Sequence, residues 1–264
     1  MKQDGKNDII ITITTDWERN DFYQGVLQGK LLSVSSAIRL VELSHRVPVF
    51  DYVHAAFLMK HSFKAFPEGT IHICMVNSES SGNQMLVFEL DNHFLILPDN
   101  GMIGLIAEGN MDKAYSFPLD LESSFSSLNS VTTAVESIVN QSIFTDSALI
   151  TTTFKQSIPF RAASDGKIIT GSVIYIDSYQ NAITNITREQ FYQAQKERRF
   201  EIYLQSINYK ISEMSNTYTD VEEGELVAFF NSVNMLEIAV HNGFIAELLS
   251  LEVGSSIMVK FFDN

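Results

Sequence analysis

The chain has 264 residues, 45% of them hydrophobic, so it can bury the core of one large domain or two of moderate size. Its formal net charge is −14 at pH 7, and its basic residues form no cluster of the kind that nucleic-acid binding needs, so no nucleic-acid partner is predicted. The single cysteine, Cys74, excludes an internal disulfide. No apolar stretch could cross a bilayer and the first residues are unlike a signal peptide, so we expect a cytoplasmic protein without a membrane partner.

The first 120 residues alternate strand-like and helix-like segments. The apolar run IIITIT at 9–14 is typical of a buried strand in a parallel sheet, and Asp21 is well placed to cap a helix behind it. Asp91-Asn92 reads as the turn of a hairpin. Further strands are predicted at 38–44, 70–76, 85–90 and 93–97, and a second helix at 51–66. Strand and helix in alternation predict an α/β sheet with right-handed crossovers.

The second half of the chain has a different pattern. Residues from about 120 to 153 are rich in Ser and Thr, and Val131, Val135 and Ile138 keep the spacing of a helix face. Beyond about residue 160, Gly, Asn and acidic turns separate short strands, which is typical of a small antiparallel barrel or sandwich. These strands are GSVIYI, RFEIYLQ, ELVAFF, LEIAV and SIMVKFF. We therefore predict a domain boundary near residue 160.

Asp16, Phe50 and Asn77 each come at or soon after the end of a predicted strand. In open α/β sheets, ligands bind outside the carboxyl ends of the strands. A carboxylate there either accepts hydrogen bonds from ribose hydroxyls or caps the next helix. Residue chemistry alone leaves both readings of Asp16 open.

Seven motifs spread over nearly the whole chain decide between these readings. They are TTDW…DFYQG, ELSHRVPVFD, FPEGTIHICMV, LPDNGMI, VIYIDSYQNAITNI, TYTDVEEGELVAFFNS and LEIAVHNGFIAELLSLEVGS. Their order and spacing resemble the S-adenosylmethionine hydroxide adenosyltransferases, to which the halogenating fluorinase and chlorinase are similar. The resemblance implies a Rossmann-like N-terminal α/β domain (1–160), a C-terminal antiparallel β-barrel (161–264) and a homotrimer. It places the ligand between the N-terminal domain of one subunit and the C-terminal domain of its neighbour.

The resemblance also implies roles for residues at matching positions. Asp16 matches the acid that holds the ribose diol, where two carboxylate oxygens can accept both hydroxyls. Phe50 matches a wall beside the ribose and the methionine chain. Asn77 and Ser80, in the loop that follows the third predicted strand, are also counted as substrate-binding.

The C-terminal half supplies the remaining substrate-binding positions. Asp177 resembles the acid that takes the methionine ammonium, and Asn181 the amide that reads adenine. Tyr179 and Tyr218 match aromatic positions beside the base, where flat rings contribute stacking area. Ser232 matches a hydroxyl that binds the ligand carboxylate.

The chain departs from the family at the residues that activate water. The family carries an Asp, an Arg seven residues later and a His further on. Here these positions are Asn77, Gln84 and Ser126. Water is a poor nucleophile, and loss of general-base help removes about 10²–10⁴ in rate, so hydrolysis is expected to be weak or altered. Glu79 is the new ionisable group of the loop and the candidate substitute base.

Three functions remain open. The first is an S-adenosylmethionine-dependent adenosyltransferase whose family reaction, displacement at the ribose C5′, gives adenosine and L-methionine. A variant of it uses another nucleophile, and Ser80 and Ser127 stand near the positions that help hold the halide in the halogenating relatives. The second is a noncatalytic sensor of S-adenosylmethionine or adenosine, and the third a frame that only shapes the trimer. S-adenosylmethionine is the predicted substrate or ligand, and no metal is expected.

Overall fold

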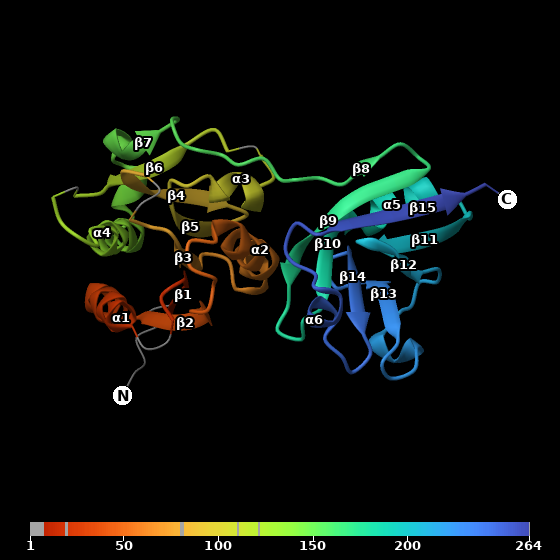
Figure 1. Cartoon of the computed structure of the whole chain (residues 1–264). Coiled ribbons are helices and arrows are strands. Elements are labelled where there is room, and N and C mark those ends of the chain that lie inside the picture. Colours follow the sequence, from red (N-terminus) through yellow and green to blue (C-terminus); the bar gives the residue numbers. More distant parts are fainter. Residues whose placement is uncertain (1–7, 19–20, 80–81, 110, 121, 264) are drawn as a thin grey trace. The chain divides into compact units, whose positions relative to one another are not determined.

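The computed structural model describes residues 8–18, 21–79, 82–109, 111–120 and 122–263. These residues form two compact units, divided between Pro159 and Phe160 (Figure 1). Each unit has its own sheet and its own buried core. Within these ranges, no helix has the length and apolar character to cross a membrane.

A mixed sheet forms the centre of the N-terminal unit. Its strand order is β2-β1-β3-β5-β4-β6-β7, in which β2, β1, β3 and β5 run parallel and β4, β6 and β7 join antiparallel. The described strands are β1 (Ile9–Thr15), β2 (Ile38–Ser44), β3 (Ile71–Met75), β4 (Gln84–Leu90), β5 (His93–Pro98), β6 (Ala114–Pro118) and β7 (Ile150–Thr151). The predicted strands and the β4–β5 hairpin are confirmed. Asp91 and Asn92 both have positive φ, as a two-residue hairpin turn of type I′ requires.

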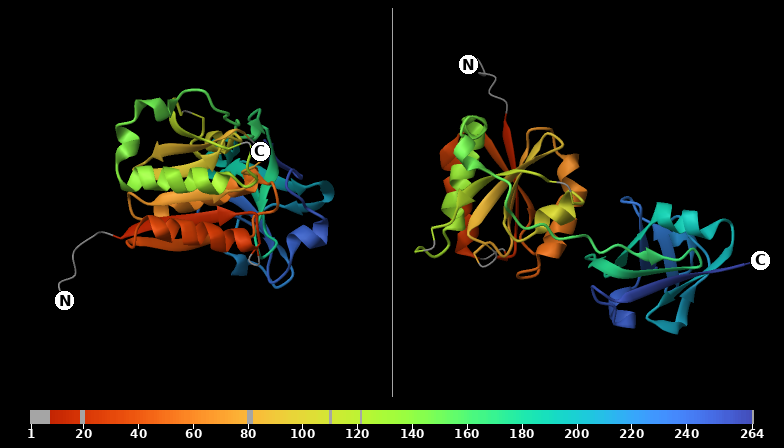
Figure 2. Two further views of the ribbon diagram at one scale, coloured as in Figure 1. Left: turned by 90° about the vertical axis from the view of Figure 1, so that its left-hand side faces the viewer. Right: turned by 90° about the horizontal axis from the view of Figure 1, so that it is seen from above.

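Helices cover both faces of this sheet, which gives three layers (Figure 2). The helices are α1 (Phe22–Val34), α2 (Tyr52–Ser62), α3 (Met102–Ile106) and α4 (Ser127–Val139), with 3₁₀ turns at Phe63–Ala65, Ser142–Phe144 and Ser147–Leu149. Successive side chains of β3 point to opposite faces of the sheet. Ile73 packs in the core with α1 and α4, whereas Cys74 packs in the core with α2 and α3. Asp21 caps α1 as predicted, accepting from the Tyr23 N–H. The α/β class is confirmed, and the Rossmann-like description stays a prediction.

The C-terminal unit is built on an antiparallel sheet in the order β12-β11-β15-β9-β10-β14-β13, with β8 paired to β9. This sheet curves until it is nearly barrel-shaped (Figure 1). Its elements are β8 (Ala163–Ser164), β9 (Ile168–Ile176), β10 (Ala182–Thr187), α5 (Arg188–Gln195), β11 (Arg199–Leu204), β12 (Ser206–Ile211), a 3₁₀ turn (Tyr218–Asp220), β13 (Leu226–Phe230), β14 (Met235–Val240), α6 (Ile245–Leu249) and β15 (Ser256–Phe262). The fully buried Phe191 of α5 lies in the core. β10, β12 and α5 were not predicted.

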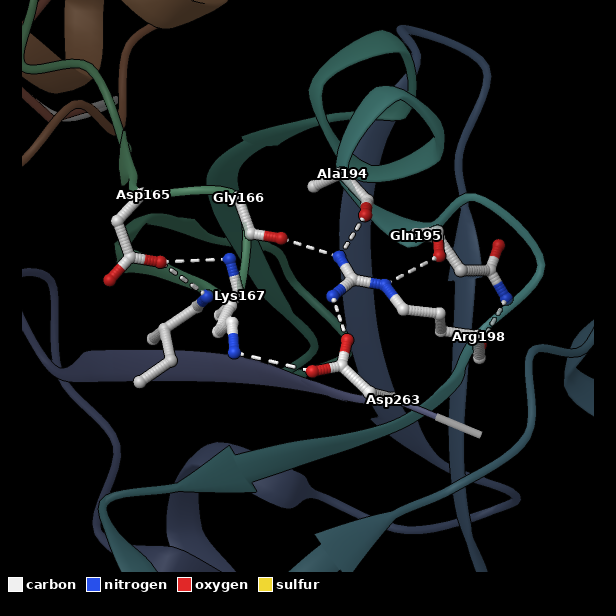
Figure 3. Close-up of polar contacts among 8 residues, drawn as sticks. Asp165, Gly166, Lys167, Ala194, Gln195, Arg198 and Asp263 are labelled. Carbon is white, nitrogen blue, oxygen red and sulfur yellow. Dashed lines mark hydrogen bonds and ion pairs between the residues drawn. The ribbon is translucent and has the colours of Figure 1, made fainter.

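The guanidinium of Arg198 connects three segments of the C-terminal unit: the end of α5, the start of β9 and the end of β15. Arg198 donates to the carbonyls of Ala194 and Gln195 at the end of α5 and to Gly166 before β9 (Figure 3). It also pairs with Asp263 at 3.1 Å, beyond the end of β15. All three nitrogens of the guanidinium thus donate within the fold, and we assign it no ligand.

A buried polar chain crosses the N-terminal sheet. Thr12 Oγ1 lies 2.8 Å from His72 Nδ1, and His72 Nε2 lies 3.1 Å from His93 Nδ1. Both rings are almost wholly buried. Burial lowers the pKa of His72 to about 4, with a smaller contribution from His93, and burial also lowers the pKa of His93.

These histidines make the stability of the fold depend on pH. Because their pKa values lie below the ordinary 6.5, the unfolded chain takes up protons first as the pH falls. The free energy of unfolding should therefore be unaffected by them above about pH 6.5. It should fall as the pH drops below 6.5, by at most about 1.4 kcal/mol per pH unit for each group, and for His72 the fall continues to about pH 4. Urea unfolding at intervals of pH measures this slope.

The substitution His72→Asn should make the slope shallower. His241→Asn is the control, because that ring lies in the other unit and contacts the Val221 carbonyl instead. An unchanged slope in His72→Asn, in a protein that still unfolds cooperatively, would contradict the assignment.

Candidate functional site

The structure brings Asp16, Phe50 and Asn77 together. β1, β2 and β3 run parallel, so the loops that follow them meet at one edge of the sheet. Asp16 is only 8% exposed, and its Oδ2 accepts the backbone N–H of Phe50 at 2.9 Å and that of Asn77 at 3.2 Å. One carboxylate oxygen therefore joins the loops after β2 and β3 to the end of β1.

Both residues that donate to Asp16 have a left-handed backbone. Phe50 has φ 67° and Asn77 has φ 53°. Asparagine tolerates this conformation, whereas it is rare for a bulky residue such as phenylalanine. Backbone strain of this kind persists where the surroundings over-determine it, and it concentrates at functional sites. The Asp16 carboxylate is the contact that holds both N–H groups in place.

A cavity of about 440 Å³ opens at this edge of the sheet. Its lining includes four acids and, among the described residues, no lysine or arginine. The lining residues are Asp16, Trp17, Glu18, Asp21, Tyr23, Val49, Phe50, Asn77, Ser78, Glu79 and Phe125. Walls of one charge sign concentrate the opposite charge, so the cavity favours a cationic ligand.

Aromatic rings form one wall of the cavity. The rings of Tyr23 and Phe125 stack with centroids 3.8 Å apart and planes within 2°, and Trp17 meets Phe125 edge-on at 5.5 Å. None of these three rings was predicted to line a site. Trp17 carries a signal in the sequence, because the only tryptophan of the chain comes directly after Asp16, whereas Phe125 lies more than 100 residues away and no local pattern connects it to this edge.

Two of the three residues predicted at the family's water-activating positions lie away from the cavity lining. Gln84, on β4, donates from Nε2 to Asp99 at 2.9 Å, and its Oε1 accepts from Ser116. Ser126 is buried at the N-cap of α4. Asn77 is the departure that lines the cavity.

The structure gives Glu79 an unpredicted contact. Its Oε1 accepts the backbone N–H of Ser127 at 3.1 Å, so the carboxylate lies at the N-terminus of α4. The partial positive charge of a helix N-terminus stabilises such an anion. Beside it, the buried Ser127 hydroxyl donates to Ser78 at 3.3 Å. Ser80, the other serine considered for halide binding, lies outside the described residues.

A second set of predicted residues meets in the C-terminal unit. Asp177 follows β9, and its Oδ1 accepts the backbone N–H groups of Tyr179 at 2.9 Å and Asn181 at 2.8 Å. Its Oδ2 accepts from Asn181 Nδ2 at 3.2 Å. The acid therefore organises the loop between β9 and β10. Tyr179 is 72% exposed at the tip of this loop, and Ser232 is exposed in the turn between β13 and β14.

The same network continues to a buried acid that we had not singled out. Asn181 Nδ2 approaches the Tyr218 hydroxyl at 3.5 Å, and that hydroxyl donates to Glu237 Oε1 on β14. Asn231 Nδ2 donates to Glu237 Oε2 at 3.1 Å. Burial, and then the bond to Glu237, raise the pKa of Tyr218 above its ordinary value, so the phenol keeps its proton.

Comparison with known proteins identifies the family. The model of the SAM hydroxide adenosyltransferase N-terminal domain matches residues 11–151, and that of the C-terminal domain matches residues 171–258. The chain belongs to the SAM hydroxide adenosyltransferase family. Asp16 and the cavity lie within the first match, and the Asp177–Glu237 network within the second.

Individual relatives agree with this family. An (R)-S-adenosyl-L-methionine hydrolase of Methanocaldococcus jannaschii is 28% identical over 105 residues, which cover 38% of this chain and 40% of that protein. The match thus spans about two fifths of the relative. Two crystal structures share the fold. An uncharacterized conserved protein from Thermotoga maritima has a TM-score of 0.78 and 18% sequence identity, and the match covers 95% of this chain and 99% of that chain. A conserved hypothetical protein from Thermus thermophilus has a TM-score of 0.70 and 20% sequence identity, and the match covers 96% of this chain and 100% of that chain.

The contact between Glu79 and α4 generates a prediction about stability. The substitution Glu79→Ala removes the carboxylate from the helix N-terminus and should lower the free energy of unfolding by about 1 kcal/mol. Glu79→Gln keeps an acceptor without the charge and should cost about half as much. Urea denaturation at low and high salt measures both, and salt should reduce the difference between the two variants.

The matched control is Glu122→Gln, in the segment leading to α4, whose N–H donates to Asp120. It should leave stability unchanged. Equal stability of wild type and Glu79→Ala would show that the carboxylate does not hold the helix in solution.

Proposed function

We propose that this protein binds S-adenosylmethionine or its adenosyl product, and that its family reaction is weak or altered. In that reaction a nucleophile displaces neutral methionine at the ribose C5′. The observation that carries the proposal is the acidic, aromatic-walled cavity around Asp16 at the carboxyl ends of β1 and β3.

The chemistry of this cavity suits an S-adenosylmethionine cation. The sulfonium carries a positive charge, which the four lining acids attract and which aromatic faces stabilise further. Asp16 supplies a carboxylate whose Oδ2 binds the loops; among the described residues its Oδ1 takes no hydrogen bond and can accept a ribose hydroxyl. An anionic nucleophile such as a halide would meet the same acids as a barrier, which argues against halogenation.

The residues at the family's water-activating positions support low hydrolysis. Asn77 can orient a water but cannot take its proton. Gln84 is held by Asp99 and Ser116, and Ser126 is buried at the start of α4. Glu79 lines the cavity and is the candidate base, although one of its oxygens caps α4.

In the C-terminal unit, we assign adenine to Asn181 and the aromatic rings of Tyr179 and Tyr218. The methionine ammonium is assigned to Asp177 and its carboxylate to Ser232. The protein is proposed to be a homotrimer in which the N-terminal unit of one subunit and the C-terminal unit of its neighbour share the ligand. The exposed Phe50 and Tyr179 fit surfaces that a neighbouring subunit covers.

A noncatalytic sensor is the second candidate. The hydrogen bonds of the Gln84 amide favour it, because they hold that side chain against Asp99 and Ser116, and neither Gln84 nor these two partners lines the cavity. A sensor keeps the binding frame and releases the ligand intact.

The two candidates differ in turnover. Purified protein incubated with S-adenosylmethionine should bind it and release adenosine and methionine about 10²–10⁴ times more slowly than a family member with a complete base. Chromatography against a control without protein measures both products. Release many times per subunit at ordinary rates would contradict a weakened reaction, and bound but intact ligand would establish the sensor.

Asp16 offers a direct test of ligand binding. Asp16→Ala removes the charge-assisted hydrogen bonds to ribose and should weaken adenosyl-ligand affinity by at least about 1.5 kcal/mol, roughly tenfold. Asp16→Asn keeps the shape and should also lose affinity, which guards against a folding defect in the alanine variant. Calorimetric titration measures both. Asp146→Asn is the matched control, because Asp146 caps a 3₁₀ turn in the same unit.

Mixing variants tests the shared site. When equal amounts of Asp16→Ala and Asn181→Ala subunits are unfolded together and refolded, about one quarter of all sites combine two intact halves. Binding should return at that level. No recovery in a mixture that refolds and forms trimers would reject sharing between subunits, and unchanged affinity in Asp16→Ala would reject the ribose assignment.

A further inference from the structure

Glu237 is a buried carboxylate in the middle of an apolar strand. It is 4% exposed, and among the described residues it forms no ion pair with a lysine, arginine or histidine. Burial of a carboxylate is costly unless hydrogen bonds satisfy it. Its recorded donors are the Tyr218 hydroxyl and Asn231 Nδ2. Both oxygens are thus used by the site described above.

Glu237 sets the direction of the two hydrogen bonds that the Tyr218 hydroxyl makes. The Tyr218 hydroxyl donates to Glu237 Oε1 and Asn231 Nδ2 donates to Oε2, so the acid accepts at both of its oxygens. The raised pKa of Tyr218 keeps that proton on the phenol. The lone pairs of the phenol oxygen are then left to accept from Asn181 Nδ2.

This direction uses up the donors of Asn181. Its Nδ2 has two hydrogens, one directed to Asp177 Oδ2 and the other to the Tyr218 oxygen. Among the described residues, its Oδ1 receives no hydrogen bond. The amide therefore cannot flip, and it presents an acceptor alone to a ligand.

We propose that Glu237 is a positioning residue that selects a purine with an amino group at C6. Resting on the proposed adenosyl ligand, the inference is that Asn181 Oδ1 accepts from that amino group. A 6-oxo purine places an oxygen opposite another oxygen, with no hydrogen between them. A buried polar pair left without its hydrogen bond lowers affinity by about 10- to 100-fold.

The experiment compares adenosine with inosine by calorimetric titration. Wild type should prefer adenosine by at least about tenfold. Glu237→Gln can donate to the Tyr218 oxygen, which releases an Asn181 hydrogen for the ligand, so inosine should gain affinity and the preference should fall toward unity. Tyr218→Phe removes the same acceptor and should shift the preference the same way. A purely structural role would weaken both ligands equally.

Glu201→Gln is the matched control. Glu201 also accepts from a tyrosine hydroxyl, that of Tyr203, and lies on β11 outside the network. It should keep the wild-type preference. Thermal unfolding shows whether each variant is folded. If Glu237→Gln does not fold, the ratio of adenosine to inosine affinity in Tyr218→Phe decides the test.

The outcomes separate this inference from the proposed function. If wild type binds neither nucleoside nor S-adenosylmethionine, the proposed function fails and this inference with it. If wild type binds adenosine and inosine equally, or if Glu237→Gln and Tyr218→Phe both keep the wild-type preference, the adenosyl site stands and the role of Glu237 is overturned.

Discussion

The candidate site depends on one carboxylate oxygen at the edge of a parallel sheet. Asp16 Oδ2 accepts two backbone N–H groups from loops that lie 34 and 61 residues further along the chain. These bonds hold Phe50 and Asn77 in left-handed conformations, and the two residues frame the cavity. A charge-assisted bond to a buried carboxylate is stronger than a neutral one, so a single residue can fix three loops. These hydrogen bonds therefore hold in place three of the residues that line the cavity.

The negative charge of the cavity bears on the proposed reaction. In the proposed reaction, methionine leaves as a neutral molecule, so the positive charge of the sulfonium is lost beside the four acids of the cavity. The acids therefore stabilise the bound cation more than the products, and binding alone does not accelerate the reaction. Rate must come from a group that activates the nucleophile. Asn77, Gln84 and Ser126 are the residues predicted at the family's positions for that task. Asn77 lines the cavity, whereas Gln84 lies on β4 and Ser126 at the N-cap of α4, outside the cavity lining.

The sequence predicted what depends on local pattern. The β1 run, the β4–β5 hairpin and the Asp21 cap follow from periodicity, turn chemistry and capping, each set by neighbouring residues. β10 was missed because Thr and Asn interrupt its apolar residues, although nearly all of it is buried. The Glu79 contact with Ser127 spans 48 residues, and the Tyr218–Glu237 bond joins a turn to a strand, so no local pattern contains them.

Glu237 also shows why residue type alone does not define a binding group. An asparagine can donate and accept, and which it offers to a ligand depends on the partners that hold it. Here the orientation passes through three side chains, from an acid that accepts at both oxygens, through a phenol that donates to it, to an amide whose hydrogens are used. Because the acid is buried, replacing it changes the direction of the hydrogen bonds as well as their number. If the proposed adenosyl ligand binds here, a residue on strand β14 that does not touch the base therefore determines its recognition as much as the residues that do.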